Sequence, residues 1–307
     1  MALGPRQFLD DFVVTGGSSG IGKCVAIEVA KRGAHVTLIA RDVDKLEEAK
    51  SEVIKNCLHP DQQQIQCISL DISNNYEVVE RTLHSSEEDI GPIYMLVNCA
   101  GSAICGRLED TSVEDVQYLL NLNFLGTLYP TKAIISRMKC RGEGRIVLVG
   151  SQAALVGIYG FTAYSGTKFA VRGLAEALHM EAKPYNVSVT LALPPDTDTP
   201  CFANEEKSKP LETKLISQEA GLVSPEEVAS KLVKDALDGK FYSTVGFESA
   251  LLSVVCSGMT PVSSLGEFLL QVLLMGPLRV VSVFYLISFH RIIRKCMKTR
   301  DKNKKSE

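Results

Sequence analysis

Short apolar runs alternate with longer stretches of mixed apolar and charged residues along most of the chain. Helical patterns such as 23–32 separate these runs, and an uninterrupted apolar run is typical of a parallel strand that is covered on both faces. The alternation predicts an α/β protein with a doubly wound parallel sheet, the Rossmann fold. We expect six strands, at residues 12–14, 34–40, 64–70, 94–98, 145–149 and 187–193.

The hydrophobic pattern changes from Ala250 onward. Residues 268–289 have the length of a membrane-spanning helix, which needs about 20 apolar residues, but Pro277 and Arg279 interrupt the middle. We therefore expect a re-entrant hairpin or an interfacial helix instead of a continuous transmembrane helix. An apolar dimerisation element with a solvated tail is the alternative, which leaves a homo-oligomer open.

Composition and charge narrow the class of protein. The net charge of −3 argues against nucleic-acid binding, although eight Lys and Arg against two Asp and Glu follow from Arg291 onward. That basic end suits an anionic membrane surface. The nine cysteines include no C-x-x-C pair, so we expect no zinc site and a reducing compartment. Nothing near the N-terminus resembles a signal peptide.

A glycine-rich segment, Thr15–Gly22, directly follows the first predicted strand and precedes a helical pattern. Strand, glycine turn and helix is the context of a dinucleotide fingerprint, in which the helix N-terminus offers free N–H groups to a pyrophosphate. Gly16–Gly20 also satisfies the G-x-S-x-G elbow of hydrolases. That elbow normally follows several strands, so the nucleotide interpretation is favoured. Its expected contacts are Gly16, Ser18, Ser19, Gly20, Ile21 and Gly22.

Polar or special residues follow the ends of the other predicted strands. Because ligands of a doubly wound sheet bind at the carboxyl ends of its strands, we expect these residues to converge on one crevice. Taken singly, Asp71 has the alternative of capping a helix, and Asn98 that of shaping a turn. The convergent set is Arg41, Asp71 with Ile72, Asn98, Ser151 and Pro194.

Tyr164 and Lys168 lie four residues apart, and Ser151 lies thirteen positions before Tyr164. In a helix this spacing places the phenol and the ammonium on one face, a turn apart. A fixed cation stabilises a phenolate, so we expect the pKa of Tyr164 to fall from about 10 toward neutrality. Such a tyrosine exchanges a proton with a carbonyl oxygen. The spacing by itself also fits a solvated helix face.

The end of the second strand indicates the cofactor. Sites selective for NAD usually carry an acidic residue here, whereas this chain has Ala40 and then Arg41, with Lys45 a turn further on. Fixed positive charge suits a 2′-phosphate, and a guanidinium also stacks on adenine. Asp42 weakens this signal. We expect NADP(H) in preference to NAD(H).

These motifs resemble the short-chain dehydrogenase/reductase family over roughly residues 10–245. The family's T-G-x-x-x-G-x-G loop, its N-A-G segment (98–101, with Cys99 as the second residue) and its mid-helix Asn (Asn123) are present. The resemblance implies that Tyr164 is the acid–base residue and that Ser151 binds the substrate oxygen. It implies that Lys168 lowers the pKa of Tyr164 and binds the nicotinamide ribose. Asn123 would hold a water that relays protons to Lys168.

Further segments resemble one group within this family, the 3-ketodihydrosphingosine reductases: 151–153, 160–165, 194–200, 209–213 and the apolar C-terminal part. That resemblance implies NADPH-dependent reduction of a long-chain keto-amine to sphinganine, in ceramide synthesis at the endoplasmic reticulum membrane, with the catalytic domain facing the cytosol. It divides the chain into an NADP-binding catalytic domain, 1–248, and a membrane-associated segment with a basic tail, 249–307.

Several alternatives stay open on the sequence. A membrane-bound steroid or retinoid dehydrogenase would share the same catalytic residues, and a cofactor-binding scaffold without turnover is a third class. Animal members of the group typically begin with a membrane span, which this sequence does not have. The anchor is then either entirely C-terminal, or the sequence is a form that lacks the first span.

Overall fold

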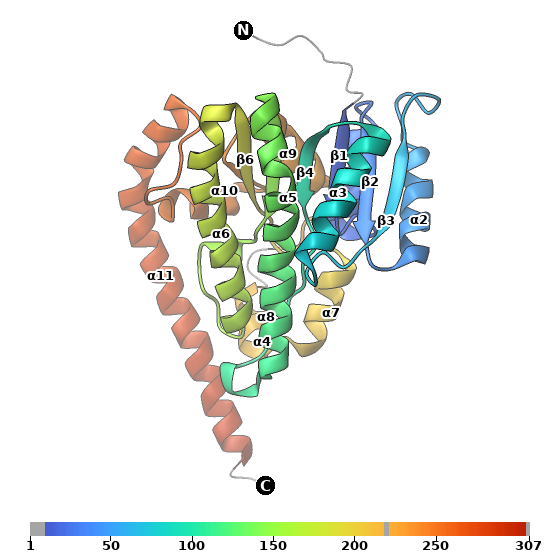
Figure 1. Ribbon diagram of the computed structural model, residues 1–307. Coiled ribbons are helices and arrows are strands. Elements are labelled where there is room, and N and C mark those ends of the chain that lie inside the picture. The colour runs from blue at the N-terminus through green and yellow to red at the C-terminus, as the bar shows by residue number, and fades with distance from the viewer. Residues whose placement is uncertain (1–9, 218–220, 305–307) are drawn as a thin grey trace.

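The computed structural model describes residues 10–217 and 221–304, and the strands and helices of these residues form one layered α/β body (Figure 1). The strands are β1 (Asp11–Thr15), β2 (His35–Ala40), β3 (Ile65–Ser69), β4 (Ile93–Asn98), β5 (Gly144–Val149), β6 (Val187–Leu193) and β7 (Tyr242–Thr244). The α-helices are α1 (Gly20–Ala30), α2 (Val43–Ile54), α3 (Tyr76–Ile90), α4 (Val113–Leu119), α5 (Gly126–Arg141), α6 (Thr162–Ala182), α7 (Pro200–Ser208), α8 (Leu211–Ser217), α9 (Pro225–Leu237), α10 (Phe247–Val255) and α11 (Leu265–Lys304). Four short helical turns are η1 (Leu108–Asp110), η2 (Leu120–Leu125), η3 (Gln152–Ala154) and η4 (Lys183–Tyr185).

The seven strands form a single parallel sheet in the order β3-β2-β1-β4-β5-β6-β7. The chain reverses direction across the sheet between β1 and β4, which is the topological switch point where ligands of such sheets bind. The predicted fold class and all six predicted strands are confirmed. The sequence pattern missed β7, because three residues at a sheet edge give too short a run to stand out.

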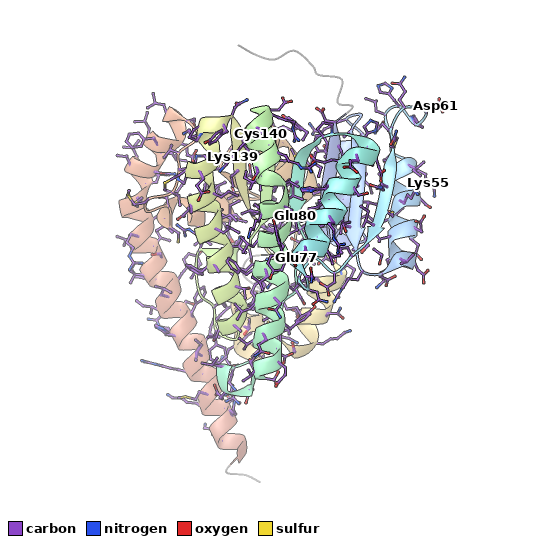
Figure 2. All side chains as sticks on the ribbon, in the orientation of Figure 1. Lys55, Asp61, Glu77, Glu80, Lys139 and Cys140 are labelled. Atoms are coloured by element: carbon purple, nitrogen blue, oxygen red, sulfur yellow. The ribbon has the colours of Figure 1, made fainter. Side chains whose placement is uncertain are left out.

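Two hydrophobic layers hold the sheet. Side chains of α1, α2 and α9 pack on one face, and those of α3, α5 and α6 pack on the other. Successive side chains of a strand point to opposite faces of the sheet, so Val14 packs in the first layer and Val13 in the second. Each fully buried aliphatic side chain contributes about 1.5–3 kcal/mol, so this double layer keeps the strand ends aligned. Charged side chains such as Lys55, Glu77 and Glu80 lie on the outer surface (Figure 2).

The C-terminal part decides between the two predicted forms of this segment. The chain forms one helix, α11, that continues through Pro277 and Arg279, so the re-entrant hairpin is wrong, and the interfacial helix stays a prediction. Proline removes one backbone hydrogen bond, and the long apolar runs on both sides keep the helical conformation. α11 lies along the side of the molecule next to α10, and extends past the body toward the C-terminus (Figure 1).

α11 contacts two helices of the domain. It packs on α10, and near its end it packs on α8, where the Arg300 guanidinium pairs with the buried Glu212 carboxylate. It also carries exposed apolar side chains, including Leu273 and Phe284. Among the residues that the structure describes, this is the one helix long and apolar enough to cross a membrane.

Candidate active site

A cavity of about 700 Å³ opens at the carboxyl ends of the central strands. Ten of the residues predicted from the sequence line it: Gly16, Ser18, Ser19, Gly20, Ile21, Gly22, Ser151, Tyr164, Lys168 and Pro194. The opposite wall comes from a part of the chain for which no site was predicted. It consists of residues of α10 and α11, among them Leu251, Val255, Leu278, Tyr285 and Phe289.

The glycine loop lies between β1 and α1 and is shaped for close backbone approach. Gly16 has φ +67° and Gly20 φ +53°, which glycine adopts without strain. A Cβ at Gly16 would lie 2.8 Å from Ala100 Cα, and one at Gly22 would collide with the Gly16 carbonyl. The Thr15 hydroxyl joins the loop to the end of β4 by accepting hydrogen bonds from Cys99 N and Ala100 N, at 3.1 and 3.2 Å.

The N-terminus of α1 is suited to an anion. The N-cap residue Ser19 makes no capping hydrogen bond with its side chain, and the first turn has no acidic residue. Its backbone N–H groups therefore face the cavity with the positive end of the helix dipole. A pyrophosphate fits both this charge and the space that the glycines leave.

Arg41 and Asp71 lie side by side where β2 and β3 end. The positive charge of Arg41 reaches Asp71, and Ser73 donates two hydrogen bonds to Asp71 Oδ1, at 2.9 Å from N and 2.6 Å from Oγ. Partial burial raises the pKa of Asp71, but these bonds and Arg41 outweigh it, so the net pKa is below the ordinary value. Both residues are exposed at this edge and neither lines the main cavity.

Asp42 and Lys45 occupy the start of α2. The Asp42 carboxylate accepts from Lys45 N at 3.1 Å as the N-cap and pairs with Lys45 Nζ at 3.3 Å. This capping role accounts for the acidic residue that weakened the cofactor prediction, because a cap needs an oxygen acceptor whatever ligand binds nearby.

Ser151, Tyr164 and Lys168 come together as the spacing predicted. The Ser151 hydroxyl hydrogen-bonds the Tyr164 phenol, and its Oγ also accepts from Ala153 N at 3.1 Å at the start of η3. α6 begins at Thr162, so Tyr164 and Lys168 lie on one face of its first turns, with Lys168 Nζ 5.6 Å from the Tyr164 ring centroid. The ammonium itself donates to Val149 O at 3.0 Å.

The expected depression of the Tyr164 pKa is not what the structure gives. Burial is the largest influence and raises the pKa of Tyr164 above its ordinary value, while the hydrogen bond from Ser151 acts in the opposite direction. Lys168 is directed at the Val149 carbonyl instead of the phenol oxygen, and burial lowers its own pKa to about 8. A phenol with a raised pKa stays protonated at neutral pH, so it is an acid.

Asn123 connects the loop after β4 to helix α6. It lies in the π-helical turn η2 and is 1% exposed. Its amide donates to Ser102 O and Thr167 Oγ1, each at 3.0 Å, and its Oδ1 accepts from Ser102 N at 2.9 Å. A Cβ on Gly101 would meet both Asn123 Oδ1 and Lys168 Nζ, at 3.2 and 3.6 Å. The amide therefore pins the loop after β4 to α6, close to the lysine.

Asn98 and Ile72 are the predicted cofactor contacts that lie in the interior. Asn98 is 1% exposed and donates to Thr131 Oγ1 at 3.0 Å, and Ile72 is 4% exposed within the apolar layer. Neither lines the cavity. Their contact with a cofactor stays a prediction, and in this structure both side chains are held by the interior packing.

Sequence reasoning missed three groups of lining residues. The α10 and α11 residues had been assigned only to a membrane, since an apolar run does not reveal which of its faces meets the domain. Asp196 lies in segment 194–200, which was used only for the family resemblance, and Glu205 lies in a segment without a motif. Cys99, noted in the sequence only as the second residue of the N-A-G segment, is partly buried at the cavity, and burial raises its pKa to about 12.

Comparison with known proteins identifies the class. The short chain dehydrogenase family matches residues 11–210, so the chain belongs to that family, a class of oxidoreductases, and the predicted resemblance is confirmed. Among curated relatives, the 3-ketodihydrosphingosine reductase of Mus musculus is 53% identical over 285 residues, which cover 93% of this chain and 86% of that protein. The 3-dehydrosphinganine reductase of Danio rerio is 51% identical over 295 residues, 96% of this chain and 89% of that protein.

A solved structure supports the same family assignment. An alcohol dehydrogenase from Thermococcus sibiricus, complexed with 5-hydroxy-NADP, is similar with a TM-score of 0.65 and 28% identity. The match covers 77% of this chain and 95% of the archaeal one.

Proposed function

We propose that the chain reduces the ketone of 3-ketodihydrosphingosine to dihydrosphingosine with NADPH, as a step of sphingolipid synthesis. The names of its relatives in vertebrates and plants support this activity. The observation that carries it is the shape of the cavity. One part of the lining holds Ser151 and Tyr164, and the part from α10 and α11 is mostly apolar as far as Phe289, which suits a ketone on a long alkyl chain.

The chain's own residues fit the proposed cofactor. The glycine loop and the N-terminus of α1 would hold the pyrophosphate. Arg41 and Lys45 would supply positive charge for the 2′-phosphate at the end of β2, and Asp71 lies near Arg41. Pro194 and Lys168 line the cavity and would contact the nicotinamide half of the cofactor. When bound, the cofactor supplies the hydride.

Tyr164 supplies the proton in this proposal. Its raised pKa keeps the phenol protonated at neutral pH, so it donates to the ketone oxygen as negative charge develops there. Ser151 hydrogen-bonds the same oxygen, and the Lys168 ammonium stabilises the charge left on the phenol. Asn123 holds the loop and α6 in register, and its nearness to Lys168 is compatible with a proton relay through water.

We also propose that the protein resides at the endoplasmic reticulum membrane with its catalytic domain in the cytosol. α11 is a candidate membrane helix, and its C-terminal part carries Arg291, Arg294 and Lys295. Contacts of α11 with α10 and, at Arg300, with α8 hold the helix along the domain, which favours an interfacial position over a crossing. We also propose that the chain divides at residues 248/249 into a catalytic domain and a membrane-associated segment. Residues of α10 and α11 nevertheless line the catalytic cavity.

An NADPH-oxidation assay tests the proposed activity. The full chain in detergent or liposomes is given 3-ketosphinganine, and separately a ketosteroid and retinal. We expect turnover of the sphingoid ketone at a kcat/KM far above the other two. Preference for the steroid or retinal would assign the other lipid class, and NADPH binding without turnover of any of them would indicate a scaffold.

A further inference from the structure

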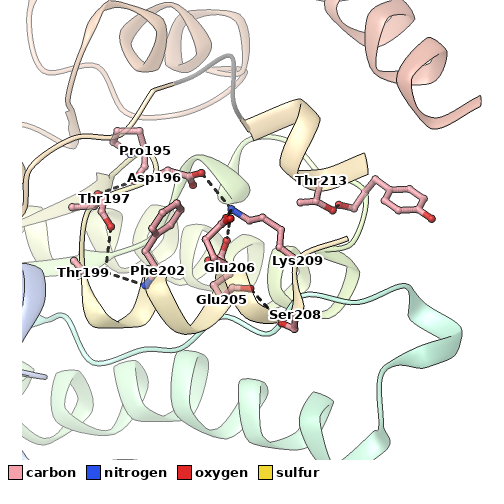
Figure 3. Close-up of polar contacts among 11 residues, drawn as sticks. Pro195, Asp196, Thr197, Thr199, Phe202, Glu205, Glu206, Ser208, Lys209 and Thr213 are labelled. Carbon is pink, nitrogen blue, oxygen red and sulfur yellow. Dashed lines mark hydrogen bonds and ion pairs between the residues drawn. The ribbon is translucent and has the colours of Figure 1, made fainter. Parts of the chain in front are cut away.

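A buried lysine gathers three carboxylates beside the cavity. Lys209 Nζ lies 2.6 Å from Glu206, 2.9 Å from Glu205 and 3.5 Å from Asp196, and its side chain is 0% exposed. Figure 3 shows these carboxylates converging on the ammonium. The ammonium also lies 4.7 Å from the Phe202 ring centroid and 5.9 Å from that of Phe161. We refer to Asp196, Glu205, Glu206 and Lys209 as the Lys209 cluster.

The local sequence explains why these groups meet. Thr199 caps α7, with its Oγ1 accepting from Phe202 N at 3.2 Å, and Pro200 begins the helix. Glu205 and Lys209 are four residues apart across the end of α7, so they meet on one side of the chain. Asp196 reaches the same ammonium from the loop after β6.

The cluster is unbalanced in charge. One ammonium faces three carboxylates, and in the ionised state this leaves two negative charges in excess. Burial is the largest influence on the pKa of Glu205 and of Asp196 and raises both, which is the effect of holding carboxylates out of water. A second cation at this position would offset the remaining negative charge.

Two of the three carboxylates face the cavity. Asp196 and Glu205 line it, whereas Glu206 is more exposed and does not. Glu205 is 8% exposed, and its Oε1 is buried and pairs with Lys209 Nζ at 2.9 Å. A carboxylate has about four acceptor sites on its two oxygens, so one contact with Lys209 does not use up its capacity to accept hydrogen bonds.

The same carboxylates lie close to the reacting phenol. The Phe161 ring lies between the two groups, with its centroid 5.3 Å from that of Tyr164 and 5.9 Å from Lys209 Nζ. The charges of Glu205 and Asp196 both reach the Tyr164 hydroxyl and raise its pKa. A cation held by them is therefore near the ketone on which Tyr164 acts.

We propose that Asp196 and Glu205 recognise a substrate ammonium group on the carbon next to the reacting ketone. This inference rests on the proposed function and deepens it, since 3-ketodihydrosphingosine carries its amine at that carbon. The two carboxylates accept hydrogen bonds from the ammonium, and Lys209 holds them in place. They select an α-amino ketone, while the apolar wall from α10 and α11 accepts the alkyl chain.

A pair of substrates tests the inference in the full chain. 3-Ketosphinganine is compared with 1-hydroxyoctadecan-3-one, which has the same chain and ketone and lacks the amine. The wild-type protein is expected to favour the amine by about 10- to 100-fold in kcat/KM, the range for hydrogen bonds to a charged group. Equal kcat/KM values would overturn the proposal.

The variant Glu205→Gln keeps the size of the side chain and removes its charge. We expect its KM for 3-ketosphinganine to rise about 10- to 100-fold, while the KM for the substrate without the amine changes less than about twofold. Glu77→Gln is the control, because Glu77 is exposed on α3 and lies outside both the cavity lining and the Lys209 cluster, and both KM values should stay unchanged.

The ratio of the two substrates within one variant does not depend on how much protein folds. If Glu205→Gln lowers turnover of both substrates equally, Glu205 is only structural and the proposal is wrong for that residue. If Glu205→Gln does not fold, Asp196→Asn is measured in the same way. Failure of the wild-type protein to reduce 3-ketosphinganine, together with turnover of another ketone, would refute the proposed function instead.

Discussion

The two walls of the cavity are built from different parts of the chain and differ in chemistry. The inner wall comes from the ends of β1, β4, β5 and β6, and it is polar and rich in glycine and backbone groups. The outer wall comes from α10 and α11, about a hundred residues after Tyr164, and is mostly apolar.

This difference separates two tasks. The inner wall is fixed by the sheet, whose hydrogen bonds and two apolar layers hold each strand end in place. Proton donation and cofactor binding need such fixed geometry. The outer wall needs only to exclude water and to accept a chain, which apolar helix faces do without exact placement. Variants on the two walls should therefore change different kinetic constants.

The largest expected effect comes from removing the proton donor of the inner wall. Tyr164→Phe should lower kcat by about 10²- to 10⁴-fold, the usual contribution of an acid–base group, while the Kd for NADPH stays nearly unchanged. Steady-state kinetics and fluorescence titration measure the two. Tyr185→Phe, at an exposed tyrosine, is the control, and retained activity in Tyr164→Phe would refute the mechanism.

Arg41 tests the cofactor end of the same wall. Arg41→Ala should raise the KM for NADPH about 10- to 100-fold, because it removes charged hydrogen bonds to a 2′-phosphate, and should leave the KM for NADH nearly unchanged. An equal rise for both cofactors would contradict the assignment to NADP(H). Lys55→Ala, at the far end of α2, provides a charge-matched control.

Phe289 tests the outer wall. Phe289→Ala should raise the KM for a long-chain substrate by about tenfold, as expected for a lost apolar contact, and should have little effect on a short-chain ketone of the same head structure. Phe284→Ala is the matched control, since Phe284 is on the same helix, is 67% exposed and does not line the cavity. Equal effects of the two changes would mean that this wall does not bind the chain.

The exposed side of α11 separates membrane contact from substrate binding. In flotation with vesicles that contain anionic lipid, Leu273→Asp combined with Phe284→Asp should lower the bound fraction of the protein severalfold. Both positions lie outside the cavity lining, so activity on a detergent-solubilised substrate should be retained. Unchanged flotation would show that the surface of α11 has another partner.

The smallest effect is a pH dependence. Burial lowers the pKa of Lys168 to about 8. Its amine is therefore protonated and charged below that pH, and it loses the charge as the pH rises through that value. Reductase kcat/KM should therefore be level near pH 7, fall to about half near pH 8 and decline further above it. The raised pKa of Tyr164 keeps the proton donor intact over this range. A profile that declines only near pH 10 would show that the charge of Lys168 is not depressed in this way.

Much of the inner wall could be predicted because each residue lies next to a recognisable local pattern. The glycine loop follows an apolar strand, Ser151 follows another, and the four-residue step from Tyr164 to Lys168 holds in any α-helix. The pKa of Tyr164 could not be predicted in this way. It depends on burial and on Glu205 and Asp196, which reach the phenol only in the folded chain.

By itself, the sequence determined the parallel sheet, the order of its strands along the chain and the set of polar residues at their ends, because hydrophobic periodicity and glycine turns act locally. Tertiary structure alone decided that α11 continues through Pro277 and that one side of it closes the cavity. It also decided that Asn98 and Ile72 are buried and that the Lys209 cluster stands beside Tyr164. Such contacts join residues far apart in the chain, and their energies depend on packing and burial that no local pattern contains.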